Sequence, residues 1–286
     1  MRIEAEHLTY IYGPGLPWEK RALDDVSLQF EEGEFVGLVG ETGSGKSTLV
    51  QLLNGLLRPT SGRVLLDGVD LTDKKAPIWK ARLQVGLVFQ FPESQLFAET
   101  VAEDIAFGPR NLGLSRQEVA KRVEESLLKV GLEPARFRQR SPFTLSGGEK
   151  RLVAIAGILA MEPRVLIVDE VTAGLDPRGK RDILTRIKLL HRNERVTVIM
   201  VSHDMDEIAS LVERVVVLKG GRICRQGLTR EVFSDEESLA GCGIQLPTIP
   251  HILSSLVKAG WSLPVSIFDV REAARLIAQE YHDGII

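Results

Sequence analysis

Short runs of consecutive apolar residues, each bounded by turn-forming residues, recur along the first 228 positions of the chain. Such runs are typical of strands that are buried on both faces, and helical patterns separate them. Strands that alternate with helices predict an α/β fold with a mostly parallel sheet and helices on both of its faces. The predicted strands are Val36–Val39, Val85–Phe89, Val165–Val168, Val196–Val201 and Val215–Leu218.

Two stretches depart from this alternation. Residues of about 95–160 carry mainly helical patterns, so we expect a helical subdomain inserted into a main domain that spans 1–228. Residues 229–286 carry two amphipathic patterns and predict a small helical C-terminal extension. The apolar stripe of the first pattern comprises Ile252, Leu253, Leu256 and Val257. The second comprises Val270, Ala273, Ala274 and Ile277, and it follows Asp269 and Glu272, which resemble a capping box.

Composition narrows the class of protein. The 286 residues are 44% hydrophobic and 26% charged, which is ordinary for a globular protein, and the net charge of -3 provides no basic field for nucleic acid. The two cysteines, Cys224 and Cys242, fit a reducing compartment, and we expect neither a disulfide nor a zinc site. The N-terminus lacks the apolar core of a signal peptide, and the apolar runs are too short to span a bilayer. A transport role would therefore need a separate membrane partner.

A phosphate-binding loop follows the first of these strands. Residues 40–47 read GETGSGKS and match GxxxxGK[ST] between the strand Val36–Val39 and a helical pattern at Thr48–Leu57. The glycines let backbone N–H groups face an anion at a helix start, and this strand–loop–helix context disfavours a chance match. We expect Lys46 to reach the β and γ phosphates of ATP and Ser47 to ligate Mg²⁺. The expected nucleotide-binding residues here are Gly40, Glu41, Thr42, Gly43, Ser44, Gly45, Lys46, Ser47 and Thr48.

A pair of acids follows another apolar strand. Asp169 and Glu170 come directly after Val165–Val168, and taken alone they could simply mark where a strand meets solvent. Beside a phosphate loop they indicate magnesium-dependent chemistry: Asp169 would hold Mg²⁺ through its hydration shell, and Glu170 would polarise the attacking water as general base. Because successive strand residues point to opposite sides, we expect the two acids to have different tasks.

A second anion-binding helix start lies at Ser146, Gly147 and Gly148, within Leu145–Glu149 and ahead of the helical pattern Lys150–Met161. The chain thus has two such helix starts but one phosphate loop. With this signature it resembles the ABC ATPase family of P-loop NTPases, and the resemblance covers roughly residues 1–228. It implies that the signature contacts the γ-phosphate bound by a second subunit, and that the cofactors are ATP and Mg²⁺.

The resemblance assigns four further positions. It implies that Gln90 is the Q-loop residue and a ligand of Mg²⁺, that 174–176 form the D-loop, and that His203 is the switch histidine. Tyr12 matches the aromatic residue that stacks on adenine, with Tyr10 as the competing candidate. Taken alone, a glutamine or histidine is usually a surface or core hydrogen-bonding group, and a tyrosine can be a core aromatic.

Two positions depart from the family pattern. Glu149 stands where the signature often has Gln, and because Ser146 to Gly148 still supply the anion contacts we expect this change to be tolerated. Val171 stands where Pro is frequent after the catalytic acid; it restores a backbone N–H, and we expect it to loosen the exit of the strand and to affect the placement of Glu170.

A finer resemblance involves the segment after Gln90. Residues 91–97 and 100–109 are similar to the ATPases of energy-coupling factor (ECF) transporters and their cobalt or nickel relatives, which import vitamins and metal ions. The resemblance implies a groove that receives a coupling helix of a transmembrane subunit, and the acidic Glu93 and Glu103 would suit a basic, apolar helix. Alternatively, the apolar residues here only pack the helical insertion; they are Phe91, Leu96 and Phe97. The tail is also similar to the extension that pairs ATPase subunits in this subgroup, with a helical cap on its own domain as the alternative.

Together these features predict an ATP-hydrolysing motor subunit of an ECF-type importer at the cytoplasmic face of the membrane. Its partners would be a second ATPase subunit, identical or paralogous, a transmembrane coupling subunit and a substrate-binding membrane subunit, with no nucleic acid. Exporter ATPases are the nearest alternative. A chromosome-structure or repair ATPase would need a coiled coil between Gln90 and Ser146, and a translation-linked protein would carry two cassettes. Retention of Glu170 and His203 argues against a non-hydrolysing module. The transported solute would be selected by a membrane subunit.

Overall fold

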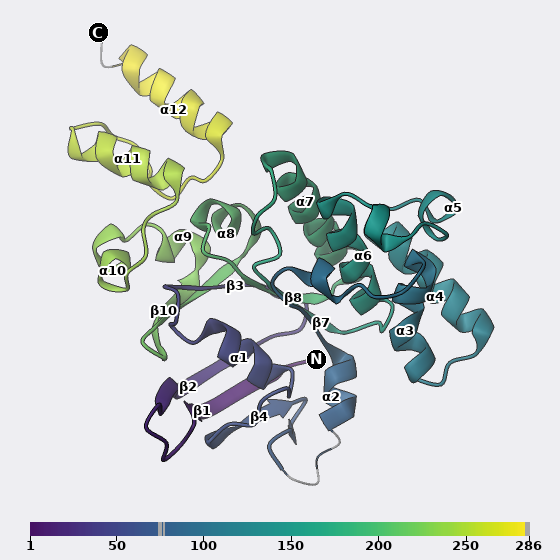
Figure 1. Ribbon diagram of the computed structural model, residues 1–286. Coiled ribbons are helices and arrows are strands. Elements are labelled where there is room, and N and C mark those ends of the chain that lie inside the picture. The colour runs from purple at the N-terminus through teal and green to yellow at the C-terminus, as the bar shows by residue number, and fades with distance from the viewer. Residues whose placement is uncertain (74–75, 77, 284–286) are drawn as a thin grey trace.

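The computed structural model describes residues 1–73, 76 and 78–283. Its main sheet has six strands in the order β10-β9-β3-β8-β7-β6 (Figure 1). The pairs from β9 to β6 are parallel, and β10 is antiparallel to β9. The strands are β3 (Phe35–Gly40), β6 (Val85–Val88), β7 (Val165–Asp169), β8 (Thr197–Val201), β9 (Arg214–Lys219) and β10 (Arg222–Leu228). The mostly parallel sheet predicted from the sequence is confirmed.

Each central strand contributes to two hydrophobic cores because its side chains alternate between the two faces of the sheet. In β7, Val165 and Ile167 belong to one core, and Leu166 and Val168 belong to the other. This two-sided burial explains why the strands read as continuous apolar runs rather than as alternating patterns.

A second, antiparallel sheet was not predicted. It has the order β2-β1-β4-β5 and covers helix α1 (Lys46–Leu53), which lies between the two sheets (Figure 1). Its strands are β1 (Ile3–Tyr12), β2 (Lys20–Phe30), β4 (Ser61–Leu66) and β5 (Val69–Asp70). The predicted helix to Leu57 was too long: α1 ends at Leu53, and Gly55 then adopts a positive φ of 75° that suits glycine.

A helical subdomain lies to one side of the main sheet (Figure 1), as the predicted fold class requires. It contains η1 (Pro92–Gln95), α3 (Val101–Asn111), α4 (Arg116–Lys129), α5 (Pro134–Phe137), η2 (Pro142–Thr144) and α6 (Gly147–Leu159). The main domain also carries α2 (Ile78–Gln84), α7 (Pro177–Glu194) and α8 (Met205–Leu211).

The C-terminal segment has two parts. Helices α9 (Thr229–Val232) and α10 (Glu236–Gly241) pack on the main domain, and Phe233 and Leu239 belong to its hydrophobic core. The two predicted amphipathic helices are present as α11 (Thr248–Lys258) and α12 (Val270–Asp283), which project away from the sheets (Figure 1). The division of the chain after residue 228 therefore stays a prediction, because the segment that follows still packs on the main domain.

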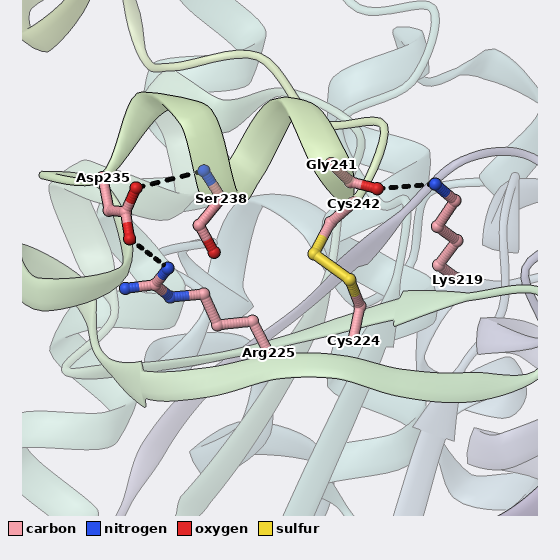
Figure 2. The surroundings of a disulfide bond; sticks show 7 residues. All are labelled: Lys219, Cys224, Arg225, Asp235, Ser238, Gly241 and Cys242. Carbon is pink, nitrogen blue, oxygen red and sulfur yellow. Dashed lines mark hydrogen bonds and ion pairs between the residues drawn. A yellow bond between two sulfur atoms is a disulfide. The ribbon is translucent and has the colours of Figure 1, made fainter.

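The two cysteines form a disulfide, contrary to the expectation from the sequence. Figure 2 shows Cys224 on β10 bonded to Cys242, which follows α10, with a Cα–Cα distance of 6.0 Å. Nearby, Lys219 Nζ donates to the Gly241 carbonyl oxygen at 2.6 Å, and Arg225 pairs with Asp235 at 2.7 Å. The expectation failed because it used local spacing alone, whereas α10 folds back over β10 and brings together cysteines 18 positions apart.

Within the described part of the chain, no helix is both long enough and apolar enough to cross a membrane.

Candidate nucleotide-binding and hydrolysis site

The phosphate loop curls around its own lysine. Lys46 Nζ donates to the carbonyl oxygens of Gly40 at 2.8 Å and Glu41 at 3.0 Å. Gly45 precedes α1 with φ 107°, and a Cβ there would lie 2.5 Å from the Ala22 carbonyl oxygen. Only glycine therefore fits at this point, and the loop can bring its N–H groups together at the start of α1.

Lys46 is buried, with 7% of its surface exposed. Burial lowers the pKa of Lys46, while the nearby charges of Glu170 and Asp169 act in the opposite direction. The lysine therefore lies between two carbonyl oxygens and two acids, in a position suited to an additional anionic partner such as a nucleotide phosphate.

Asp169 ends β7 beside the first turn of α1 and is 7% exposed. Burial raises the pKa of Asp169, and a hydrogen bond with Ser47 opposes that change. A carboxylate paired with a hydroxyl is a hard oxygen donor set, which is the kind that Mg²⁺ prefers. Ser47 and Asp169, two of the three residues that the sequence assigned to magnesium, thus lie together and fit the ion.

Glu170 lies one residue beyond β7 and has a left-handed backbone conformation, φ 49°. Its carboxylate accepts a hydrogen bond from Gln90 Nε2 at 2.8 Å and lies 3.4 Å from His203 Nδ1. The three residues predicted to be catalytic therefore meet at one point. Asp169 and Glu170 thus have different partners, as expected: Asp169 binds Ser47, whereas Glu170 contacts Gln90 and His203. Alternation along the strand is one cause, and the left-handed backbone at Glu170 is a second.

A cavity of about 350 Å³ opens between these groups. Its lining includes most of the predicted nucleotide-binding residues, namely Tyr12, Thr42, Gly43, Gly45, Lys46, Ser47, Thr48, Gln90, Asp169 and Glu170. Lys20 and Ala22 of β2 also line it, and no motif in the sequence marked them. Among the other predicted residues, Gly40 and Glu41 bind Lys46, and Ser44 Oγ is buried with no hydrogen-bond partner in the described structure.

Tyr12 is the better placed of the two candidate stacking residues. It lines the cavity, is 38% exposed and bonds through its hydroxyl to Thr48 Oγ1 at 3.1 Å. Tyr10 packs edge-on against the ring of Tyr12, with 4.8 Å between ring centroids, and is not among the described residues that line the cavity. An exposed ring beside the phosphate loop can stack on a base.

The signature residues lie elsewhere in the subunit. Ser146 caps α6, its hydroxyl accepts from the Glu149 N–H, and Glu149 Oε2 accepts from the Ser146 N–H at 2.9 Å. Backbone hydrogen bonding to Ser146 lowers the pKa of Glu149, and Arg140 and Arg136 act in the same direction. Glu149 thus forms a capping box and supports the helix start. Among the described residues that line the cavity, Ser146, Gly147 and Gly148 do not appear.

Two expectations about neighbouring residues were wrong. Glu93 is not a free acid for a docking helix, because both of its oxygens bind the buried guanidinium of Arg151. Val171 does not loosen the exit of β7: it is 1% exposed, and its carbonyl oxygen accepts from Arg151 Nη1 at 2.7 Å. A single arginine, not recognised in the sequence, thus accounts for both differences.

The apolar residues after Gln90 divide into two groups. Leu96 is 8% exposed and packs in the core, whereas Phe91 and Phe97 are 46% and 61% exposed. Phe97 packs edge-on against Phe107 of α3, which is itself 52% exposed. Packing of the helical subdomain therefore explains why Leu96 is apolar, whereas Phe91 and Phe97 remain exposed on the surface.

A P-loop beside two acids, joined to a separate signature helix on an inserted helical subdomain, defines an ATPase of the ABC class. The profile of the family described as ABC transporter matches residues 23–173. The chain is 49% identical to the energy-coupling factor transporter ATP-binding protein EcfA2 of Clostridium perfringens (strain 13 / Type A), covering 98% of each sequence. It is 51% identical to the EcfA2 protein of Symbiobacterium thermophilum, covering 97% of this chain and 96% of that one. The chain belongs to the ABC transporter family, in its energy-coupling factor ATP-binding branch, and is an ATPase that uses ATP with Mg²⁺.

Solved structures agree with this placement. The chain is similar to cbiO1 of Clostridium perfringens, which is described as part of the ABC transporter complex cbiONQ, with a TM-score of 0.75 and 38% identity over 88% of this chain and 98% of that one. It is also similar to the ATP-binding cassette MJ0796 in a dimeric post-hydrolysis state bound to ADP and Pi, with a TM-score of 0.70 and 32% identity over 79% and 98% of the two chains.

Proposed function

We propose that this chain is the ATP-hydrolysing motor subunit of an ECF-type importer and acts at the cytoplasmic face of the membrane as a peripheral subunit. Its similarity to named ECF ATP-binding proteins over nearly its full length supports this function. The transported solute would be a vitamin or a transition-metal ion, as in the relatives that the sequence resembles, and separate membrane subunits would carry it.

We assign the residues of the cavity to distinct tasks. Lys46 and the N–H groups of the phosphate loop bind the phosphates, and Tyr12 stacks on adenine. Ser47, Asp169 and Gln90 would hold Mg²⁺, which neutralises phosphate charge when bound. Glu170 orients and deprotonates the attacking water. His203 lies near Oε1 of Glu170, whereas Gln90 binds Oε2, and it would stabilise the charge of this carboxylate.

The working unit would be a dimer with nucleotide between the subunits. The observation that supports this most directly is the separation of Ser146–Gly148 from the cavity lining within one subunit. The capped start of α6 would contact the γ-phosphate held by a second copy or by a paralogous ATPase. ATP would favour the closed pair, and hydrolysis would release it, because the nucleotide binds the two states with different affinity.

The projecting helices would contribute a second contact between ATPase subunits. Each amphipathic stripe is only half covered within one subunit: Leu253 and Ala273 are buried, whereas Ile252, Val257 and Val270 are 44%, 40% and 64% exposed. Exposed apolar residues on a helix that leaves its domain favour an interface over a cap on the same domain. This supports the pairing role proposed for the extension.

The membrane partners would be a transmembrane coupling subunit and a substrate-binding subunit. The exposed Phe91 and Phe97 form a surface after Gln90 that an apolar helix can cover. Glu103 remains as an acidic residue of this region, since Glu93 is occupied by Arg151.

Two variants test the motor. We expect Lys46→Ala to lose ATP binding, and Glu170→Gln to retain binding while turnover falls by about 100-fold or more. In light scattering with MgATP, Glu170→Gln should form a stable dimer that Lys46→Ala cannot form. Near-normal affinity in Lys46→Ala, wild-type turnover in Glu170→Gln, or hydrolysis by a strict monomer would refute these assignments.

A reconstitution experiment tests the importer. The chain is purified with candidate coupling subunits from detergent-solubilised membranes, and uptake of vitamins and metal ions into proteoliposomes is measured. ATP-dependent uptake should require an intact Glu170. Assembly with an exporter-type membrane subunit, and efflux alone, would contradict the proposed direction of transport.

A further inference from the structure

Arg151 is a charged residue of α6 that the mechanism above leaves without a role. Its side chain is only 2% exposed. A buried guanidinium is costly unless it is paired and hydrogen-bonded, so its partners indicate what it stabilises.

The partners of Arg151 belong to two separate segments. Nε and Nη2 donate to the two carboxylate oxygens of Glu93 in η1, at 2.9 and 2.5 Å. Nη1 donates to the carbonyl oxygens of Val171 at 2.7 Å and Ala173 at 2.8 Å. One planar group thus connects the signature helix, the segment after Gln90 and the segment after Glu170.

Both segments lie next to catalytic groups. Glu93 is three positions beyond Gln90, and Val171 directly follows Glu170, while Gln90 and Glu170 are themselves hydrogen-bonded. The ring of Phe91 adds a contact, because it lies 5.8 Å from the Arg151 guanidinium and packs near Gly174.

The segment after Glu170 is also held from its other side. The Thr172 hydroxyl donates to the buried carboxylate of Glu207 at 2.8 Å, and Ser202, the residue before His203, donates to the same oxygen at 3.1 Å. With Arg151 bound to the carbonyl groups on either side of Thr172, the backbone that carries Glu170 has little freedom to rotate.

We propose that Arg151 is a positioning residue for hydrolysis, which holds the Glu170 carboxylate against Gln90 and transmits any displacement of η1 into the hydrolysis site. The inference rests on the proposed role of Glu170 as general base. Arg151 does not line the nucleotide cavity among the described residues, so its effect passes through Glu93, Val171 and Ala173. Lysine cannot replace Arg151, because an ammonium group lacks the planar set of N–H donors of a guanidinium. Arg151 uses this set to bind both carboxylate oxygens of Glu93 and two backbone carbonyl oxygens at once.

The experiment measures kcat and the KM for ATP in Arg151→Lys and Glu93→Gln. We expect Arg151→Lys to lower kcat by about tenfold or more with KM within about twofold of wild type, because orientation of the base is lost but nucleotide contacts remain. Glu93→Gln keeps the arginine and its carbonyl contacts and should show a smaller loss of the same kind.

Matched controls distinguish an effect on the position of Glu170 from an effect on the stability of the fold. Arg122→Lys alters another ion-paired arginine of the helical subdomain and should leave kcat and KM unchanged. Folded fraction and melting temperature are measured for every variant, and ATP affinity is measured for Arg151→Lys combined with Glu170→Gln, where hydrolysis does not interfere. Affinity should match that of Glu170→Gln alone.

The outcomes for the two proposals are distinguishable. If Glu170→Gln turns over normally, the assignment of the base fails whatever Arg151 does. If Glu170→Gln is inactive but folded Arg151→Lys and Glu93→Gln both keep kcat within twofold of wild type, only the role of Arg151 is overturned. A loss of kcat that merely follows the unfolded fraction overturns it as well. If Arg151→Lys does not fold, Glu93→Gln decides alone.

Discussion

Gln90 Nε2 donates a hydrogen bond of 2.8 Å to the carboxylate of Glu170, so the second residue after the edge strand β6 contacts the acid that follows β7. These residues are 80 positions apart in the sequence, and the whole helical subdomain lies between them. The bond therefore connects the beginning and the end of the insertion at the proposed hydrolysis site. A movement of the insertion relative to the main sheet would change it.

Replacing Gln90 should impair turnover more than binding. In Gln90→Ala, Glu170 loses its amide donor but keeps His203 nearby, so we expect kcat to fall by about tenfold. ATP affinity should change by less than about threefold, because Ser47 and Asp169 remain to hold Mg²⁺. Steady-state ATPase assays and calorimetric ATP titrations measure the two effects. Equal changes in both would indicate instead that Gln90 acts mainly in nucleotide binding.

The base-stacking assignment predicts a contrast between two variants at one position. Tyr12→Ala should raise the KM for ATP by about tenfold, because stacking of an aromatic ring on a base is lost. Tyr12→Phe removes only the hydroxyl bond to Thr48 and should remain close to wild type. Tyr10→Phe serves as the matched control. A large effect of Tyr12→Phe would show that the hydroxyl, rather than the ring, matters.

Much of this site could be predicted from the sequence because its motifs are local. The loop from Gly40 to Ser47 and the pair Asp169 and Glu170 follow buried strands whose apolar runs are easy to identify, and the order of parallel strands brings their ends together. What remained hidden depends on contacts between distant segments. Nothing near Arg151 indicates Glu93, which is 58 positions away, as its partner.

The antiparallel sheet was missed for a related reason. Residues of β1 and β2 face the core on one side and solvent on the other, and β1 contains register shifts, so its period-two pattern is interrupted. The long strand β2 also brings Lys20 and Ala22 to the nucleotide cavity. Continuous apolar runs indicate strands that are buried on both faces, whereas strands with one exposed face, such as β1 and β2, lack them.

The ion pair between Glu93 and Arg151 predicts a defined pH dependence of stability. Burial raises the pKa of Glu93, but the hydrogen bonds from Arg151, a backbone hydrogen bond and the charges of Arg151 and Lys150 together outweigh it. The pKa therefore lies below its ordinary value. A group with a lowered pKa in the folded state stabilises the fold above its unfolded pKa and loses that contribution as the pH falls through the folded pKa.

Wild type should therefore melt at a higher temperature than Glu93→Gln at neutral pH, and the difference should shrink below about pH 4.3, the ordinary pKa of glutamate. Thermal unfolding across a pH series measures it, and Glu103→Gln is the control, because Glu103 of α3 forms no ion pair within the described part of the chain. A difference that stays constant with pH would mean that the carboxylate charge contributes nothing.

The disulfide predicts a redox-dependent stability. Closing the loop between Cys224 and Cys242, 18 positions apart, should stabilise the fold by about 3 kcal/mol in the chain-entropy account. We expect Cys224→Ser to lower the melting temperature and dithiothreitol to lower that of wild type by a similar amount. Since Cys224 is exposed, the serine variant loses little packing of its own.

The variant also serves as the control for the reagent, because dithiothreitol should leave the melting temperature of Cys224→Ser unchanged. The effect should extend to nucleotide binding: Gly243, the residue after Cys242, approaches the side chain of Glu41 so closely that a Cβ there would collide with it. Release of the tether would loosen this contact with the phosphate loop and weaken ATP affinity modestly. Identical melting and affinity with and without the reductant would show that the disulfide contributes nothing. Packing of Phe233, Leu239 and Ile244, with the polar contacts of Lys219 and Arg225, would then hold the segment.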